Sequence, residues 1–446
     1  MSKIKKQYVC SNCGSVSSKW SGQCFDCEAW GTIEEEILTP QVVSASIRGH
    51  AVSVETFDGS ITESMRIITP ISELNRVLGG GLVPASAILV GGDPGIGKST
   101  LLLQLSALLS ASGTSCLYVT GEESTDQVKL RANRLGLDAT GALIIAATNV
   151  HDILATIESQ KNNIELVVID SIQTMYSGDF SSSPGTVSQI RATAHELISY
   201  AKQNNIILML VGHVTKEGQI AGPKVLEHMM DTVLYFEGDP SYHFRILRSI
   251  KNRFGGANEI GVFEMTSMGL QEVLNPSQLF LMERDSNVSG TSVFAGIEGS
   301  RPLLVEVQAL IAPSTMPMPR RSVVGWDANR LSMILAVLAV RYGLNLASYE
   351  VYLSIAGGLK ITEPAVDLAV AAALISAASN KPLPDGSIFF GEIGLSGEVR
   401  KVTQADLRVR EATKLGFNHM ICAPHPNLTS DKMSTISHVK QLKGLL

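Results

Sequence analysis

A short glycine-rich stretch carries the residues with the clearest chemistry in this chain. Gly92 is followed, at fixed spacing, by Gly97, Lys98 and Ser99. Glycines let successive backbone N–H groups turn toward an anion. A lysine and a hydroxyl at the end of such a loop reach outer phosphates and magnesium. The spacing therefore predicts a site for ATP and Mg²⁺. Its binding residues would be Gly92, Asp93, Pro94, Gly95, Ile96, Gly97, Lys98, Ser99 and Thr100, with Ser99 also a magnesium ligand.

The flanks of this stretch favour the same interpretation. An apolar run at 87–90 precedes it and an amphipathic run begins at Leu101, which predicts strand, loop and helix in that order. The start of a helix adds a partial positive charge where the phosphates would lie. The alternative is an ordinary Gly/Pro turn, for which such flanks are not needed.

Carboxylates follow two further predicted strands. Asp170 ends the apolar run 164–169, a pattern typical of a residue that holds magnesium or its water. Glu122 and Glu123 follow the strand at 116–119 and could position or deprotonate an attacking water. We predict that Glu122 is the base, although the sequence leaves the choice between the two glutamates open. Lys98, Glu122 and Asp170 together predict ATP hydrolysis.

A histidine closes another predicted strand. The apolar run 206–211 is followed by Gly212 and His213. A polar side chain at this edge of a parallel sheet can sense the outermost phosphate. A single histidine can equally be a hydrogen-bonded bystander, so both interpretations of His213 remain open.

Four cysteines near the N-terminus have the spacing of a metal site. Cys10 and Cys13 form one pair, and Cys24 and Cys27 form a second. Two such pairs are typical of tetrahedral thiolate zinc sites, whereas a redox pair belongs before a helix. Four thiolates leave zinc no open position, so we predict a structural Zn²⁺ module. Whether it contacts DNA or a protein is not evident from the sequence.

Composition limits the classes of protein to consider. The chain has 446 residues, of which 45% are hydrophobic and 17% charged, with a net charge of −6. Such a chain can bury two to four cores, and any nucleic-acid contact must come from local basic patches. No run of 18 apolar residues or signal segment is evident, so we expect no membrane partner. Clustered cysteines suit a reducing compartment, which predicts a cytoplasmic protein.

The order of the predicted elements indicates the architecture. Strands and helices alternate after the phosphate loop, as a parallel α/β sheet requires. We divide the chain into a zinc module at 1–35, a linker at 36–69, an ATPase domain at 70–285 and a C-terminal α+β domain at 286–446. The glycines at 79–81 predict a helix end followed by a flexible lead into the phosphate-loop strand.

Several motifs together resemble a known family. The stretches 79–81, 91–100, 121–124 and 168–171 are similar to those of the RecA superfamily of ring- or filament-forming ATPases. The four-cysteine module, the C-terminal region and the motif at 251–255 (Lys-Asn-Arg-Phe-Gly) narrow the resemblance to the RadA (Sms) family of bacterial DNA repair and recombination ATPases. The resemblance covers essentially the whole chain. One departure is Ala85, where a glycine is common.

The resemblance implies roles that composition does not. Residues 180–188 and 215–229 match DNA-binding loops, the second of which holds Lys216, Lys224 and His228. Lys251 and Arg253 would act in trans on the nucleotide of a neighbouring subunit. Without the resemblance, these stretches read as disordered loops and a solvated turn. The implied partners are single-stranded and branched DNA, further copies of the chain in a hexameric ring, and the RecA recombinase filament.

The C-terminal region resembles the proteolytic domain of Lon, which uses a serine activated by a lysine. Matching the motifs places Ala365 at the serine position and Asp406 at the lysine position. Neither residue can do that chemistry, so we predict an inactive, Lon-like scaffold that binds DNA. The candidate DNA contacts are cationic side chains that could each be merely solvated: Arg320, Arg321, Arg330, Arg400, Lys401, Arg408 and Arg410.

These expectations combine into one function. The chain would be a DNA-dependent ATPase that acts as a ring motor on single-stranded DNA. It would promote branch migration, extending heteroduplex in recombination intermediates during homologous recombination and DNA repair. Two alternatives remain: a RecA-like strand-exchange recombinase that forms filaments, and a DNA-binding scaffold that is not a motor.

Overall fold

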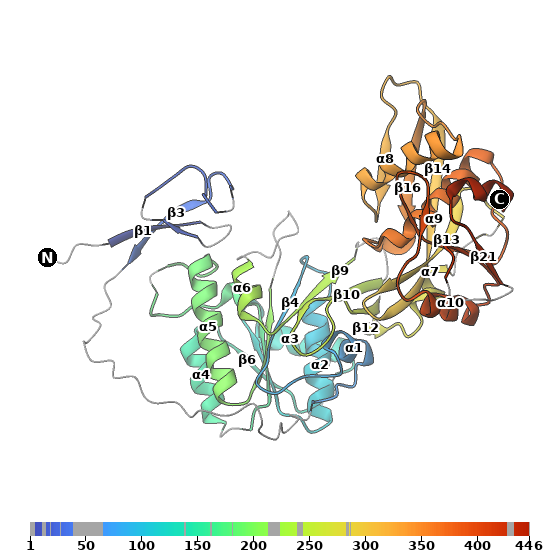
Figure 1. Cartoon of the computed structure of the whole chain (residues 1–446). Coiled ribbons are helices and arrows are strands. Elements are labelled where there is room, and N and C mark those ends of the chain that lie inside the picture. Colours follow the sequence, from blue (N-terminus) through green and yellow to red (C-terminus); the bar gives the residue numbers. More distant parts are fainter. Residues whose placement is uncertain are drawn as a thin grey trace, which may run out of the picture. The chain divides into compact units, whose positions relative to one another are not determined.

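The computed structural model divides the chain into two compact units, which we describe separately (Figure 1). The first comprises Met1–Glu237 and Arg245–Glu272, and the second comprises Gly238–Phe244 and Val273–Leu446. The second unit thus begins before the expected boundary at 286. The residues that the structure describes are 5–10, 15–17, 19–26, 28–38, 66–137, 140–160, 163–180, 182–212, 224–238, 244–281, 285, 287–425 and 432–445.

The N-terminal part of the first unit contains a small antiparallel sheet. Its strands are β1 (Lys5–Cys10), β2 (Val16–Ser17) and β3 (Ile33–Leu38), in the order β2-β1-β3. Cys10 ends β1 and is buried, as is Cys24. A module this small needs a stabiliser besides its apolar residues, which agrees with the predicted metal.

A nine-stranded sheet forms the centre of the first unit, in the order β12-β11-β10-β9-β4-β8-β7-β5-β6. Strands β9, β4, β8, β7, β5 and β6 run parallel to one another, which confirms the α/β class. The strands are β4 (Ala87–Gly92), β5 (Cys116–Thr120), β6 (Leu143–Ala146), β7 (Leu166–Asp170), β8 (Ile207–Val211), β9 (Thr232–Glu237), β10 (Phe244–Asn252), β11 (Ile260–Thr266) and β12 (Gly269–Glu272).

Helices cover both faces of this sheet (Figure 1). They are α1 (Ser72–Leu78), α2 (Lys98–Ala111), α3 (Thr125–Arg134), α4 (Val150–Ser159), α5 (Val187–Gln203) and α6 (Lys224–Met229). Successive strand residues point to opposite faces. Ile88 and Val90 therefore pack in the core under α1 and α2, whereas Leu89 packs in the core under α4 and α5. Because both faces are buried, the strands read as unbroken apolar runs.

The glycine triplet at 79–81 is close-packed rather than the flexible lead expected from its composition. All three glycines have positive φ, from +76° to +123°. A Cβ on Gly79 would lie 2.9 Å from the Cα of Gly255, the last residue of the Lys-Asn-Arg-Phe-Gly motif. The Arg66 side chain donates to the carbonyls of both Gly79 and Phe254. Arg66 therefore already belongs to this unit's packing, although it precedes the expected boundary at 70.

The second unit is built on a seven-stranded mixed sheet in the order β15-β16-β14-β13-β17-β20-β21. Its buried helix α9 packs on β13, β14 and β17. Helix α7 packs on β14, which explains why this unit begins near residue 273. Its helices are α7 (Pro276–Leu281), α8 (Ala328–Val337), α9 (Asp367–Ser379) and α10 (Ala405–Lys414). Its strands are β13 (Thr291–Glu298), β14 (Arg301–Pro313), β15 (Arg321–Val324), β16 (Tyr349–Ile355), β17 (Ser387–Phe390), β20 (His419–Cys422) and β21 (Met433–Thr435), with a separate hairpin of β18 (Glu392–Ile393) and β19 (Val399–Arg400). Among the described helices of the whole chain, none is both long and apolar enough to cross a membrane.

Candidate active site

The loop between β4 and α2 has the shape of a phosphate cradle. Gly92 and Gly97 have φ values of +144° and +120°, which residues with a Cβ rarely adopt. A Cβ on Gly92 would lie 2.9 Å from the Cβ of Phe236, and one on Gly97 would lie 2.9 Å from the Cε of Met265. Ile96 is buried and anchors the loop in the core. The loop backbone is thus held at the start of α2, where an anion is favoured.

Lys98 is the first residue of α2, and only 4% of it is exposed. Its ammonium donates to the carbonyl oxygens of Gly92, at 2.7 Å, and Asp93, at 2.9 Å. Burial lowers the pKa of Lys98, against the opposing pull of Asp170, Asp93 and Glu122. The hydrogen-bond acceptors are neutral carbonyls, and a phosphate would supply an anionic partner instead. The loop residues therefore fit a nucleoside triphosphate.

Asp170 ends β7, two strands from the phosphate loop and on the face that carries α2. Its Oδ2 accepts a hydrogen bond from the hydroxyl of Tyr118, a buried residue of β5. Asp170 is among the groups that act on the charge of Lys98, so the two residues share one electrostatic site. Ser99 and Asp170 supply the hard oxygen ligands that magnesium prefers, so these residues fit Mg²⁺.

The two glutamates after β5 lie in different surroundings. Glu123 forms an ion pair with Arg131, at 2.9 Å. Glu122 accepts a hydrogen bond of 2.7 Å from the hydroxyl of Ser171, the residue after Asp170, and acts on the pKa of Lys98. Glu123 is thus engaged in an ion pair, whereas Glu122 shares the electrostatic surroundings of Lys98; that Glu122 is the base stays a prediction.

Lys251 and Arg253 are held at the end of β10 by backbone and carboxylate oxygens. The Lys251 ammonium donates to the carbonyls of Glu227, at 2.7 Å, and Met230, at 2.8 Å, next to α6. Arg253 pairs with Asp231 at 3.0 Å. The Asp231 carboxylate also accepts from Lys202, at 2.9 Å, and from the backbone N–H that begins β4, at 3.0 Å. Asp231 lies in no recognisable motif, so its position between these cations could not be predicted from the sequence.

These two cations lie at the opposite end of the sheet from the phosphate loop. Asn252 pairs with Thr232 across β9 and β10, and Thr232 pairs with Ile88 across β9 and β4. Gly92, where the loop begins, lies four residues further along β4, which is about 13 Å. One chain therefore does not bring Lys251 or Arg253 to its own phosphates.

The described part of the zinc module places two of the four cysteines. The Cys10 sulfur and the Thr32 hydroxyl are hydrogen-bonded at 3.2 Å, and either group could be the donor. Both Cys10 and Cys24 are buried. The backbone N–H of Cys10 donates to the carbonyl of Ser15, and that of Cys24 donates to the carbonyl of Ala29, both at 2.9 Å, so the two pairs begin in the same way. Cys13 and Cys27 lie outside the described residues. The four-thiolate donor set fits zinc.

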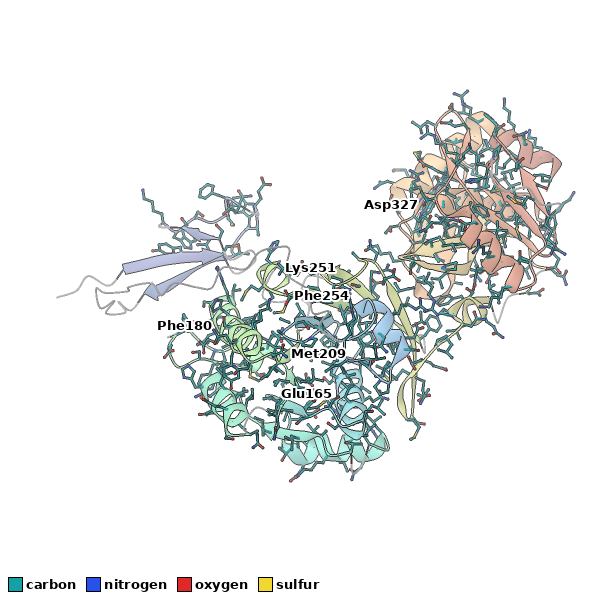
Figure 2. The ribbon with its side chains drawn as sticks, turned by 60° about the horizontal axis from the view of Figure 1, so that its bottom comes forward. Glu165, Phe180, Met209, Lys251, Phe254 and Asp327 are labelled. Carbon is teal, nitrogen blue, oxygen red and sulfur yellow. The ribbon has the colours of Figure 1, made fainter. Side chains whose placement is uncertain are left out.

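The predicted DNA-binding loops are only partly described. His213, Lys216 and the side chain of Lys224 lie outside the described residues, whereas His228 is exposed. Figure 2 labels Phe180, which begins the first loop and is half-exposed. The Gln189 amide donates to the carbonyls of Ser177, Phe180 and Ser182. This glutamine therefore orders the base of the first loop.

The C-terminal unit has buried ion pairs around Ala365. Ala365 is 1% exposed and has no nucleophilic atom. Arg408 has no exposed surface: it pairs with Glu363 and donates to the Ala295 carbonyl at 2.6 Å. The prediction that Arg408 contacts DNA is therefore wrong, because its guanidinium is buried and already bound to partners within the chain. Asp406 is half-exposed and lies 3.7 Å from Arg410.

Arg330, another candidate DNA contact, pairs with Asp367, which is fully buried. The Ile393 backbone N–H also donates to that carboxylate, at 2.9 Å. Burial nevertheless raises the pKa of Asp367, against the opposing effect of Arg330. Arg330 thus has a structural partner already, unlike a solvated cation that could exchange water for phosphate.

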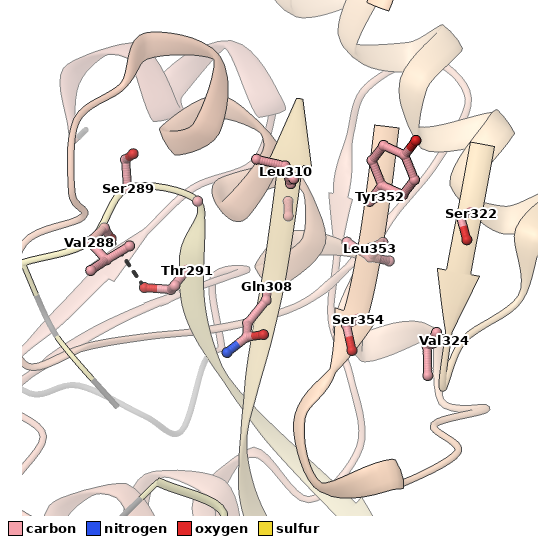
Figure 3. Close-up of a pocket in the computed structure, with 12 residues that line it drawn as sticks. Val288, Ser289, Thr291, Gln308, Leu310, Ser322, Val324, Tyr352, Leu353 and Ser354 are labelled. Carbon is pink, nitrogen blue, oxygen red and sulfur yellow. Dashed lines mark hydrogen bonds between the residues drawn. The ribbon is translucent and has the colours of Figure 1, made fainter. Parts of the chain in front are cut away.

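A separate pocket of about 440 Å³ lies over β13, β14, β16 and β15 of this unit (Figure 3). Its lining includes the hydroxyls of Ser322, Tyr352 and Ser354 beside apolar residues such as Leu310. Among the described residues that line it, none is a histidine, a lysine or a carboxylate.

Three family models match separate parts of the chain. An "AAA domain" model matches residues 55–219, which include the phosphate loop. A "rubredoxin metal binding domain" model matches residues 8–35, which contain the four cysteines. A model described as "Subunit ChlI of Mg-chelatase" matches residues 328–427 of the C-terminal unit.

Full-length relatives decide the family. The DNA repair protein RadA of Rickettsia felis is 66% identical over 446 residues, covering 100% of both chains. RadA of Bacillus subtilis is 49% identical over 434 residues, covering 96% of this chain and 94% of that one. The chain belongs to the RadA family. A crystal structure of the RadB recombinase covers 45% of this chain and 96% of its own at 23% identity, with a TM-score of 0.37. That similarity is too low to support an argument.

RadA membership and the three family models confirm the expected fold class. A RecA-like P-loop ATPase core joins a zinc-ribbon module and a Lon-like α+β domain. The ATPase core indicates ATP hydrolysis with ATP and Mg²⁺, and the N-terminal module indicates Zn²⁺. The ATP hydrolase predicted from Lys98 and its neighbours is thereby confirmed at the level of the domain.

Proposed function

We propose that this RadA-family protein is a DNA-dependent ATPase that assembles as a hexameric ring and moves on single-stranded DNA. Its movement would extend heteroduplex at branched recombination intermediates. The observation that carries the proposal is the position of Lys251 and Arg253, about 13 Å along the sheet from the phosphate loop of the same chain. A head-to-tail contact between copies would bring them to the neighbour's nucleotide, as trans-acting cations do.

Each side chain in the site has a task in this proposal. Lys98 would exchange its carbonyl partners for phosphate oxygens, and Glu122 would position the attacking water. Ser99 and Asp170 would hold magnesium, which when bound neutralises charge on the phosphates. Arg253 must leave Asp231 to reach a neighbour, so hydrolysis would depend on how the copies are packed.

DNA is the proposed substrate because the full-length relatives are DNA repair proteins. Contacts to phosphates would dominate binding that is independent of sequence, so affinity should fall steeply with salt. Lys216, Lys224 and His228 are the proposed loop contacts, and His213 is the proposed sensor of the outermost phosphate. We place this activity in the cytoplasm, with the RecA filament as a candidate partner.

The test is an assay of branched-DNA extension with the wild type, Lys98→Ala and Arg253→Ala. We expect both variants to lose extension, because each removes one half of a shared site. Arg134→Ala, an exposed arginine at the end of α3, is the matched control and should extend DNA normally. Normal extension by both Lys98→Ala and Arg253→Ala would contradict the motor.

A strand-exchange recombinase is the second candidate, because a head-to-tail interface that does not close gives a filament rather than a ring. Electron microscopy with DNA separates the two: closed rings favour the motor, and filaments with strand invasion favour the recombinase. A scaffold without motor activity predicts that Lys98→Ala fully complements a deletion of the gene.

The C-terminal domain completes the proposal as an assembly scaffold that binds DNA without cleaving protein. Ala365 and Asp406 stand where a Lon protease needs a nucleophile and a lysine. We expect no cleavage of casein by the full chain, and robust cleavage would overturn this assignment.

A further inference from the structure

The Tyr118 hydroxyl is a buried hydrogen-bond donor with a specific acceptor, and none of the proposed steps of ATP hydrolysis requires this hydroxyl. Tyr118 is 1% exposed, and its hydroxyl donates to Oδ2 of Asp170. The two residues are 52 positions apart in the chain. A buried tyrosine hydroxyl needs a partner. Here the partner is the carboxylate proposed to hold magnesium, and carboxylates that bind metals are commonly oriented by such outer hydrogen bonds.

Sheet register explains why these two side chains meet. Thr120 pairs with Asp170 and Tyr118 pairs with Val168 across β5 and β7. Residues two apart on a strand point to the same face, so Tyr118, Val168 and Asp170 all lie on the side of α2. The tyrosine ring extends along the face toward the carboxyl end of the strands, where the phosphate loop lies.

The hydroxyl acts only as a donor in this place. A carboxylate oxygen can only accept a hydrogen bond, so the phenol supplies the hydrogen of this bond to Oδ2. A carboxylate with one oxygen engaged in this way has a restricted rotation.

We propose that Tyr118 is the positioning residue for the magnesium ion, acting through Asp170. Because Oδ2 is engaged by the Tyr118 hydroxyl, Oδ1 would be the oxygen available to hold magnesium or its water. The inference rests on the proposed role of Asp170 as a magnesium ligand. Tyr118 does not touch the reacting atoms: it acts as outer partners of metal ligands do, by fixing the orientation of the ligand.

The decisive variant is Tyr118→Phe in the full-length chain, which removes one oxygen and keeps the buried ring. The readout is the binding of a fluorescent ATP analogue at increasing Mg²⁺ concentration. We expect the Mg²⁺ midpoint to rise about tenfold, while binding without Mg²⁺ and the melting temperature stay close to wild type. Tyr200→Phe is the matched control, because Tyr200 lies on α5, away from the site, and should leave the midpoint unchanged.

A double variant separates positioning from general damage. If Tyr118 acts through Asp170, Tyr118→Phe should add no further loss of Mg²⁺ dependence in an Asp170→Asn background. An unchanged midpoint in Tyr118→Phe would overturn the proposal, as would a loss of nucleotide binding at every Mg²⁺ concentration with a lowered melting temperature. A raised midpoint together with failed DNA extension by the wild type would contradict only the motor. Wild-type binding that ignores Mg²⁺ would contradict both.

Discussion

The phosphate-loop site and the surroundings of Ala365 both contain a buried cation, but the cations have different partners. Lys98 donates to the carbonyls of Gly92 and Asp93, which carry no net charge. Arg408 pairs with a carboxylate, that of Glu363, and also donates to a carbonyl. The first set of bonds can be exchanged for bonds to an anion. The second is already neutralised within the chain.

The difference shows that the charge of its hydrogen-bond partners indicates whether a buried cation binds a ligand or stabilises the fold. A desolvated cation bonded to neutral carbonyls gains free energy when an anionic ligand arrives. A desolvated cation with its own carboxylate loses free energy when either partner is removed. The buried cation of the ATPase core can therefore bind an anionic ligand, whereas the buried cation of the Lon-like domain stabilises the fold.

The largest expected effect comes from breaking the paired site. Arg408→Leu leaves the Glu363 carboxylate without its cationic partner, which should lower the free energy of unfolding of the C-terminal unit by about 3–5 kcal/mol. Denaturant unfolding of the full chain measures this. Arg410→Ala, on the exposed side of α10, is the control and should change stability by less than about 0.5 kcal/mol. A loss below about 1 kcal/mol in Arg408→Leu would contradict the structural role.

Within the ATP site, Glu122 and Glu123 should differ in their effect on the rate of hydrolysis. Glu122→Gln should lower the rate of ATP hydrolysis about 100-fold, because the base is lost, with nucleotide binding retained. Glu123→Gln removes only an ion pair with Arg131 and should change the rate less than about threefold. Steady-state hydrolysis and nucleotide affinity measure both. A larger effect on the rate in Glu123→Gln would exchange the two assignments.

The pH dependence of nucleotide binding tests whether Lys98 awaits an anion. Burial lowers its pKa in the free protein from the ordinary 10.5, and bound phosphates would raise it. Binding should then take up protons, so ATP affinity should fall as pH rises through the free-protein pKa. Calorimetry in buffers of different ionisation enthalpy measures the proton uptake, which Lys98→Ala should abolish. Equal uptake in that variant would assign it to another group.

The lowered pKa of Lys98 also makes the free energy of unfolding depend on pH. Because the folded pKa of Lys98 lies below the unfolded value, the unfolded chain binds more protons between the two. This group therefore makes the nucleotide-free protein more stable as pH rises through that window.

The smallest effect concerns Ala85, where the family commonly has glycine. Ala85 has φ of +57°, a left-handed conformation that costs a residue with a Cβ about 1–2 kcal/mol. Glycine loses part of that gain through its larger unfolded-state entropy. Ala85→Gly should therefore stabilise the core by about 0.5 kcal/mol. The control is Ala111→Gly in the last turn of α2, which should destabilise instead. Destabilisation by Ala85→Gly would refute the strain.

Local patterns were readable from the sequence because their parts are adjacent in the chain. The loop after β4 and Asp170 at the end of β7 both depend on short spacings. The Tyr118–Asp170 bond spans 52 positions, and the Arg408–Ala295 bond spans 113. Such contacts depend on how distant strands and helices pack together, which cannot be read from local patterns in one sequence.

The position of Lys251 and Arg253 is another result of strand order. Their motif was recognisable, but only the pairing of β10 with β9, and of β9 with β4, places them at the far end from the phosphate loop. That placement is the basis for the proposed site shared between copies.

Mixing two inactive variants tests the shared site most directly. Lys98→Ala keeps Arg253, and Arg253→Ala keeps the phosphate loop, so a mixed oligomer contains interfaces with both halves intact. With random 1:1 mixing, about a quarter of the interfaces are intact, and DNA-dependent ATP hydrolysis should recover to about a quarter of wild type. Activity no higher than the mean of the two variants measured separately would contradict an active site completed by a neighbouring copy.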